Sequence, residues 1–304
     1  MKKSITSLFL LLLLSLIIIF PQNAVSGATK GLLLWYRTLL PTLLPFMILT
    51  DLVIAYDAAG LLTKFLYPVF GRLFRLSQNG CFAMIVGLVC GYPMGAKVSA
   101  DLVRSDKITE QEGQYLLSFC NLASPAYING FLLNACLHVK SSAFKYILCI
   151  YIPVFLIAFL FRKTHTYQQN NTPSSTQKND TPETLEQCIM CGLKSIAMLG
   201  GYVILFAMAQ TLLNAVTNSL PDTLRLFLAG LLEITNGTEA ISDSMLSSPI
   251  QIILSLTLTS FGGCSCLFQT KSMLSGTNLS ILKYMIVKIV SAMMTALLAI
   301  LLFL

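Results

Sequence analysis

The chain has 304 residues, of which 55% are hydrophobic and only 11% are charged. Soluble domains carry about 25% charged residues. A folded domain of this size still exposes roughly a quarter of the surface that its unfolded chain would expose. The composition therefore excludes an ordinary soluble domain and indicates a surface that faces lipid. The net charge of +7 does not indicate a nucleic-acid-binding protein, because the basic residues are scattered singly between apolar runs.

Uncharged runs along the whole chain predict a helical membrane protein. A helix needs about 17 to 25 apolar residues to cross the hydrocarbon core. Runs without Asp, Glu, Lys or Arg cover residues 4–29, 76–96, 113–139, 146–161, 195–221, 244–270 and 289–304. We therefore expect an all-α, multi-pass membrane protein of about eight membrane segments, some of them broken or re-entrant, with the lipid bilayer as its first partner.

Residues 1–30 predict an N-terminal membrane anchor or a signal-like helix. Lys2 and Lys3 precede an apolar run, and Pro21 and a stretch of small residues follow it, which is also the pattern of a secretory signal peptide. An uncleaved first helix is the favoured interpretation, because the rest of the chain needs no cleavage to insert; removal of the helix stays open. In both cases the two lysines predict a cytoplasmic amino terminus.

A polar segment divides the rest of the chain into two halves. Residues 163–186 are rich in Thr, Gln, Asn, Ser and charge, which is typical of a linker. The first half then covers residues 31–162 and the second half covers residues 187–304.

The two halves are weakly similar, which predicts an internal repeat. Residues 71–80 resemble residues 230–237, and residues 86–95 resemble residues 256–266, so that each half contains a glycine-broken uncharged segment. Corresponding breaks of this kind are typical of transporters, in which they mark a binding site near the membrane midplane.

The breaks supply the candidate binding residues. Pro93 between glycines leaves backbone N–H and C=O groups without helical partners, and such groups survive at membrane depth only when they are buried in protein or line a cavity. Asn121 and Ser124 add an amide and a hydroxyl beside a proline. The predicted substrate-binding residues are Gly91, Tyr92, Pro93, Gly95, Lys97, Asn121, Ser124, Pro125, Gly262, Gly263, Ser265 and Gln269. The alternative is a kinked helix with Lys97 extending to the interface and polar groups that only cap helix ends.

Glu233 lies in a strongly apolar context, where a carboxylate is costly and indicates a functional role with a partner. Its counterpart in the repeat is Arg75, so we predict a charge pair between Arg75 and Glu233 across the axis that relates the halves. The alternative is that Glu233 lies at a helix end in the membrane interface.

The sequence predicts neither metal binding nor catalysis. Most of the nine cysteines lie in apolar runs, which does not favour a disulfide framework. A soft-metal site at Cys264 and Cys266 would need further ligands, and the chain has only two histidines. P-loop, zinc-protease and serine-hydrolase motifs are missing. We expect no metal, no cofactor and no enzymatic activity.

The motifs, taken in order, resemble a known family. They occupy residues 40–46, 91–97, 121–125, 232–237 and 260–263, with Gln269. Together they resemble the YlbJ-type sporulation integral membrane proteins, from about residue 31 to the carboxyl terminus. That family is grouped with the gate-domain, or nucleoside-recognition, membrane proteins. The resemblance implies a multi-pass protein of the bacterial cytoplasmic membrane that is needed for spore formation and has a transport-like fold.

We therefore predict a sporulation-associated membrane protein that binds or translocates a small polar solute. The alternative is a non-transporting membrane scaffold for spore assembly, which would depend on loops such as the central linker. The sequence leaves open the identity of the solute, the coupling ion and the oligomeric state, a homo-oligomer included.

Overall fold

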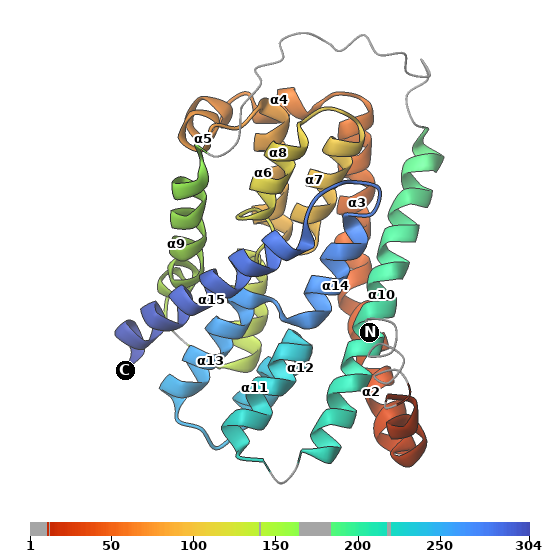
Figure 1. The fold of residues 1–304 in the computed structure, drawn as a ribbon, viewed down its shortest axis with the longest axis vertical. Coiled ribbons are helices and arrows are strands. Elements are labelled where there is room, and N and C mark those ends of the chain that lie inside the picture. Colours follow the sequence, from red (N-terminus) through yellow and green to blue (C-terminus); the bar gives the residue numbers. More distant parts are fainter. Residues whose placement is uncertain (1–10, 12, 140, 164–183, 218–219) are drawn as a thin grey trace.

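The computed structural model describes residues 11, 13–139, 141–163, 184–217 and 220–304. Every regular element in these ranges is a helix, as Figure 1 shows, which confirms the predicted all-α class. The predictions for the beginning of the first helix and for most of the polar linker concern residues 1–10 and 164–183, which lie outside the described residues.

The first half begins with a long helix that contains a π-helical turn. The elements are α2 (Pro21–Leu34), η1 (Trp35–Leu39), α3 (Leu40–Ala55), α4 (Ala59–Thr63), α5 (Tyr67–Phe74), α6 (Gln78–Cys90), α7 (Met94–Arg104), α8 (Glu110–Leu117), η2 (Tyr127–Cys136) and α9 (Phe144–Phe161). Two short helices, α4 and α5, follow the long helix. The interrupted pairs α6–α7 and α8–η2 come next.

The second half also begins with a long helix and continues with shorter, interrupted helices. It consists of α10 (Leu185–Val216), α11 (Asp222–Leu232), α12 (Ile234–Ser242), α13 (Ser248–Phe261), α14 (Gly263–Met273) and α15 (Ile281–Phe303). In Figure 1, α6 and α7 lie in the upper part of the molecule and α11 and α12 lie in the lower part. Helix α3 ends at the top, and α10 begins there and runs down.

Five helical segments among the described residues are long and apolar enough to cross a membrane, or six if the bent pair α5–α6 counts as one span. The expected number of about eight is not confirmed. The difference arises because several uncharged runs fold as two half-helices, each too short to span alone; residues 113–139, for example, contain the end of α8, a break and η2. The chain is a multi-pass membrane protein.

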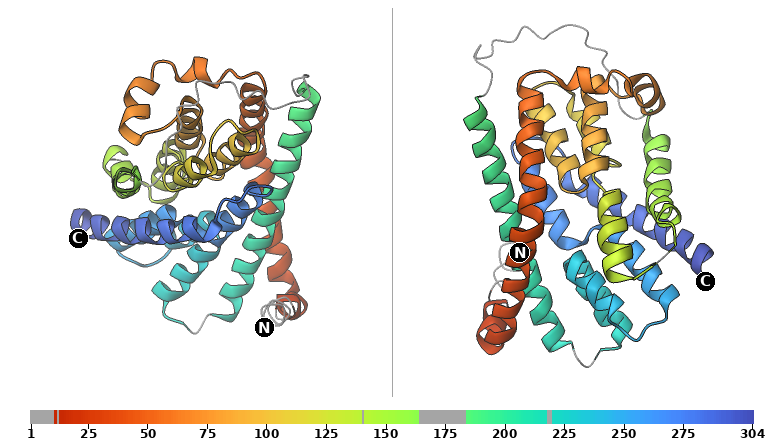
Figure 2. Two further views of the ribbon diagram at one scale, coloured as in Figure 1. Left: turned by 45° about the horizontal axis from the view of Figure 1, so that its top comes forward. Right: turned by 180° about the vertical axis from the view of Figure 1, so that it is seen from behind.

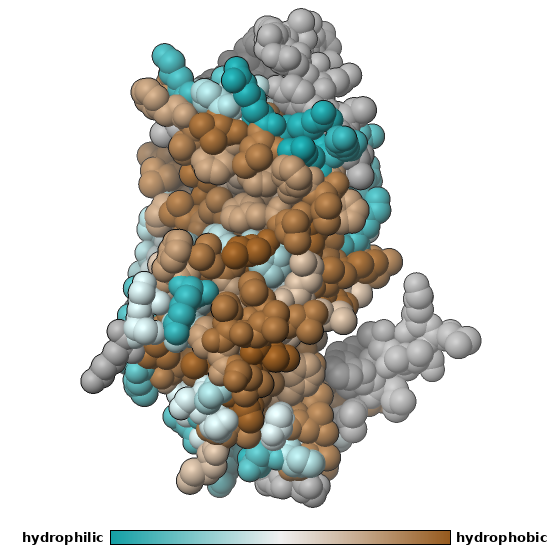
Figure 3. All heavy atoms as spheres, turned by 90° about the vertical axis from the view of Figure 1, so that its left-hand side faces the viewer, coloured by the Kyte–Doolittle hydropathy of each residue, from teal (hydrophilic) through white to brown (hydrophobic). Residues whose placement is uncertain are grey.

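The surface agrees with this assignment. Figure 3 shows a broad hydrophobic band on one side of the molecule, with hydrophilic residues gathered toward its two ends. Exposed apolar side chains such as Leu160, Leu297 and Leu301 belong to the long helices α9 and α15. Exposed leucines in such numbers are favourable only where the surrounding solvent is hydrocarbon.

Each half contains two breaks, where one was expected. Helices α6 and α7 form a hairpin that turns at residues 91–93, and α11 and α12 form a hairpin that turns at Glu233. The other two breaks, at residues 118–126 and at Gly262, separate α8 from η2 and α13 from α14. The views in Figure 2 show the two hairpins at opposite ends of the molecule.

Glycines allow the chain to cross itself at the breaks. A Cβ atom at Gly87 or at Gly95 would lie 2.1 or 2.2 Å from the carbonyl oxygen of Cys120, so both positions must lack a side chain. The second hairpin closes in the same way, because a Cβ atom at Gly237 would lie 2.3 Å from the Cα atom of Gly230. Gly95 therefore holds the first hairpin against the second break.

Substitution of Gly95 tests this packing. We expect Gly95→Ala to destabilise the protein by about 2 kcal/mol or more, because the rigid backbone at Cys120 cannot make room for a methyl group. The matched control is Gly130→Ala in η2, where an added Cβ atom meets nothing within 4 Å and the change should stay within about 1 kcal/mol. Thermal unfolding of the detergent-purified proteins measures both, and equal melting temperatures would contradict the packing argument.

Candidate functional site

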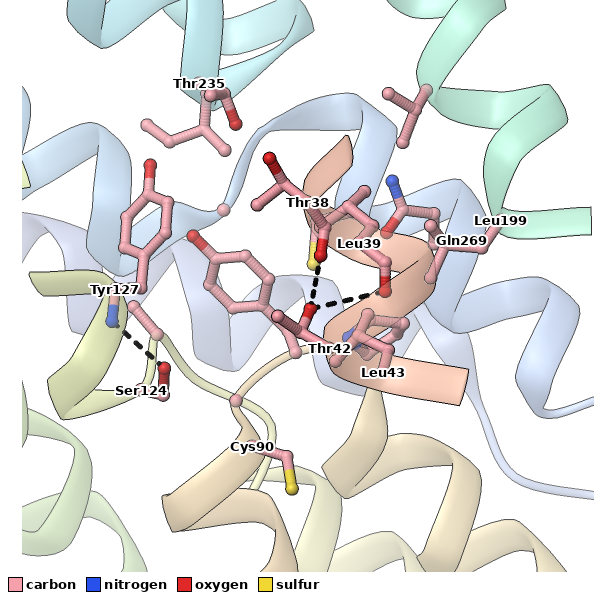
Figure 4. Close-up of a pocket in the computed structure, with 18 of the residues that line it drawn as sticks. Thr38, Leu39, Thr42, Leu43, Cys90, Ser124, Tyr127, Leu199, Thr235 and Gln269 are labelled. Atoms are coloured by element: carbon pink, nitrogen blue, oxygen red, sulfur yellow. Dashed lines mark hydrogen bonds between the residues drawn. The ribbon is translucent and has the colours of Figure 1, made fainter. Parts of the chain in front are cut away.

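A cavity of about 550 Å³ lies where the four breaks meet. Residues from all four breaks line it, and the remaining wall comes from the helices that flank the breaks and from α2, η1, α3 and α10. Figure 4 shows the hydroxyl of Tyr127 directed toward Thr235, with Gln269 and Thr38 on another side of the same space. Its volume is in the range of small-molecule sites.

The structure brings most of the predicted binding residues to this cavity and places the others behind its wall. The predicted residues that line it are Gly91, Tyr92, Pro93, Ser124, Gly262, Ser265 and Gln269. The predicted residues that do not line it are Gly95, Lys97, Asn121, Pro125 and Gly263.

The backbone of the first two breaks is held together directly. The N–H of Tyr92 donates to the carbonyl of Leu122 at 2.9 Å, and a Cβ atom at Gly91 would lie 2.8 Å from the backbone nitrogen of Ser124. Gly91 has a φ of 81°, a conformation that a side chain disfavours. The polar backbone groups of one break therefore satisfy those of the other.

Asn121 has a structural role that its sequence context did not indicate. Its side-chain nitrogen donates to the hydroxyls of Thr270 and Tyr284 at 3.0 and 2.8 Å, and its side-chain oxygen accepts from the N–H of Ala96. The amide joins α7, α14 and α15, so it is already occupied by the protein.

Lys97 neither lines the cavity nor extends to the interface. It is 1% exposed, and its ammonium donates to the carboxylates of Asp51 and Asp101. The carboxylates of Asp51 and Asp101 compensate the charge of Lys97 inside the protein, so the side chain does not extend to the membrane interface.

The structure does not bring Arg75 and Glu233 together. Arg75 ends α5 in the left-handed conformation and is exposed, whereas Glu233 is 4% exposed and lines the cavity. The oxygens of Glu233 accept from the N–H groups of Thr235 and Asn236, so the carboxylate caps the beginning of α12. The positive end of that helix takes the place of the predicted arginine.

Two tyrosine hydroxyls near Glu233 have no hydrogen-bond partner among the described residues. They belong to Tyr92 and Tyr127, which line the cavity with their rings 6.3 Å apart. A buried hydroxyl without a partner is unfavourable unless something occupies the space beside it. Tyr127 and Thr235 were missed in the sequence, although each lies within two residues of a predicted site residue.

Lys288 is the second buried lysine near the cavity. It is 2% exposed, and its ammonium donates to the backbone carbonyl of Asn121 at 3.4 Å and lies 5.8 Å from the ring centre of Tyr92. Unlike Lys97, it forms no ion pair within the described part of the chain. Its single positive charge amid apolar residues of α15 was visible in the sequence and was overlooked.

These features define an all-helical, multi-pass membrane protein whose broken helices meet at a central cavity. The chain is 25% identical to the sporulation integral membrane protein YlbJ of Bacillus subtilis strain 168, over 95% of this chain and 79% of that protein. This similarity confirms the predicted resemblance to the YlbJ-type sporulation integral membrane proteins. No family model matches the chain, and no solved structure does.

The role of Asn121 leads to a stability prediction. We expect Asn121→Leu to cost about 3 kcal/mol, because the buried hydroxyl of Tyr284 and the N–H of Ala96 would lose their partners. Gln269→Leu is the matched control, since its amide bonds only to the hydroxyl of Ser265 and the loss should be about 1 kcal/mol. Melting temperatures in detergent measure the difference. A more severe effect of the Gln269 variant would contradict this assignment.

Proposed function

We propose that this sporulation-associated membrane protein binds a small polar solute in the central cavity and moves it, chemically unchanged, across the cytoplasmic membrane. The observation that carries the proposal is the meeting of four helix breaks at one cavity. Irregular backbone is tolerated at membrane depth where it is buried in protein or lines a cavity, and discontinuous helices are a recurrent binding device of transporters.

The order of elements supports two inverted repeats. Helix α3, the hairpin α6–α7, the broken pair α8–η2 and α9 correspond in order to α10, the hairpin α11–α12, the broken pair α13–α14 and α15. The corresponding segments α3 and α10 run in opposite directions in Figure 1. This order pairs Gly91 with Glu233 and residues 118–126 with Gly262, which replaces the pairing of Gly91 with Gly262 that the sequence suggested.

The charges around the cavity favour a solute with an acidic group. Lys288 brings a buried ammonium without a carboxylate partner to the wall behind Tyr92, while the charge of Glu233 is already compensated by α12. The free hydroxyls of Tyr92 and Tyr127 can both donate to an acceptor-rich ligand. A small carboxylate meets these requirements better than an ammonium compound does.

The basic residues support an orientation. The end of the molecule that carries α4, α5, the α7–α8 connection and the end of α9 contains Lys64, Arg72, Arg75, Arg104, Lys107, Arg162 and Lys163. An excess of Lys and Arg marks the cytoplasmic side, so we place this end in the cytoplasm.

Ligand-dependent stability of the purified protein tests the function. We expect a saturable rise in melting temperature with at least one small carboxylate in a panel that also contains amino acids, nucleosides and divalent metals. At a hundredfold excess over Kd the gain is about 2.7 kcal/mol. The rise should shrink in Tyr127→Phe, and Tyr146→Phe, in α9 and outside the cavity, serves as the matched control.

Lys288→Met gives a second, opposite readout. Removing an uncompensated buried charge should raise the melting temperature of the ligand-free protein while it abolishes the response to carboxylates. No response of the stable protein to any compound would favour the membrane scaffold. A response that both variants retain would place binding outside this cavity.

A further inference from the structure

A second buried polar cluster lies one helical turn of α7 beyond the cavity. Lys97 donates to Asp51, on α3, and at 2.8 Å to Asp101, on its own helix. Asp51 is only 7% exposed, and Arg104 donates to the other oxygen of Asp101. Buried ionisable groups are costly in a membrane protein, which directs attention to what this cluster does.

The two carboxylates of the cluster are not equally satisfied. Asp101 accepts from two cations, one on each oxygen. Asp51 accepts from Lys97 with Oδ1, whereas its Oδ2 is buried and accepts no hydrogen bond of ordinary geometry from the described residues, with only the weakly donating thiol of Cys191 near the carboxylate. Asp51 therefore has a buried acceptor that the protein does not fully satisfy, and a proton is the smallest ligand that would occupy it.

The surroundings of Asp51 contain no further charge that would take this role. The charged and titratable groups described around it are Lys97, Asp101 and Arg104 on α7, Lys107 just after α7, and the thiol of Cys191 on α10. Lys107 donates to the carbonyl of Ile54 and pairs with Asp57, so it is already occupied at the end of α3.

The position of the cluster connects it to the cavity from two sides. Helix α3 lines the cavity with Thr42, Leu43 and Phe46, and carries Asp51 further along the same helix. Helix α7 begins directly after the break at Pro93, which also lines the cavity, and carries Lys97. A change in the contact between Asp51 and Lys97 therefore changes how the first hairpin is held against the wall of the cavity.

We propose that Asp51 is a proton-binding site that couples movement of the solute to movement of a proton, an inference that rests on the proposed function. One proton from water binds Oδ2 and gives the neutral acid, while Lys97 keeps its own proton and its bond to Asp101. Loss of the charge on Asp51 weakens the bond between α3 and α7 and frees the hairpin to move. Release of the proton restores the ion pair.

Infrared difference spectroscopy of the lipid-reconstituted protein tests the proton site without any solute. Lowering the pH should produce the carbonyl band of a buried carboxylic acid. The band should be lost in Asp51→Asn, shifted in Asp51→Glu and retained in Asp101→Asn. A missing band in the wild-type protein, or a band that survives in Asp51→Asn, would overturn the proposal.

Labelling of cavity cysteines tests the coupling. Cys90 and Cys266 line the cavity, and mass spectrometry can follow the reaction of each with a charged methanethiosulfonate reagent in proteoliposomes. We expect the change in labelling rate between neutral and acidic pH to differ about tenfold between the wild-type protein and Asp51→Asn. The Asp51→Asn variant is the control for thiol ionisation, because it contains the same cysteines. Parallel pH profiles of the two proteins would refute coupling.

The two experiments separate this inference from the proposed function. The infrared band depends on Asp51 alone, so its presence in a protein that binds no compound of the panel would contradict solute binding and leave the proton site in place. Solute binding without the infrared band would support the proposed function and contradict the proton site at Asp51.

Discussion

Backbone groups at membrane depth must find partners within the protein, and the rest of this structure depends on that constraint. A helix that breaks inside the membrane can satisfy its free N–H and C=O groups against another irregular segment or against side chains such as the capping carboxylate of Glu233. Here the break at Gly91 bonds to the segment around Leu122, and Gly263 packs against the carbonyl of Gly230. Breaks therefore meet in pairs, and two halves with two breaks each bring all four to one place.

A cavity follows from this arrangement, because glycine is required where the segments cross. At the crossing, Gly87 and Gly95 have no room for a side chain because the backbone of Cys120 lies against them. The cavity is lined by tyrosines, threonines and the capping carboxylate of Glu233. The same feature that makes the breaks tolerable in lipid thus produces a cavity with a few polar groups inside the protein.

Sequence reasoning located the breaks at Gly91 and Gly262 because glycine and proline interrupt helices through local sterics. It treated Glu233 as one half of an ion pair, since a break between Leu232 and Ile234 has no glycine or proline to mark it. The partners of Asn121 lie 149 and 163 residues away, and Asp51 lies 46 residues from Lys97. Such pairings depend on the tertiary arrangement, which no local pattern contains.

The two buried lysines of the molecule illustrate how context decides the role of a charge. Lys97 has two carboxylates, so it joins helices and leaves nothing for a ligand to compensate. Lys288 has a carbonyl and two tyrosine rings near its ammonium but no carboxylate partner among the described residues, so its charge stays uncompensated. The two halves of the chain therefore carry different buried charges. Under the proposed function and the proposed coupling, Lys97 provides a contact that a proton can break, and Lys288 provides the attraction that a solute satisfies.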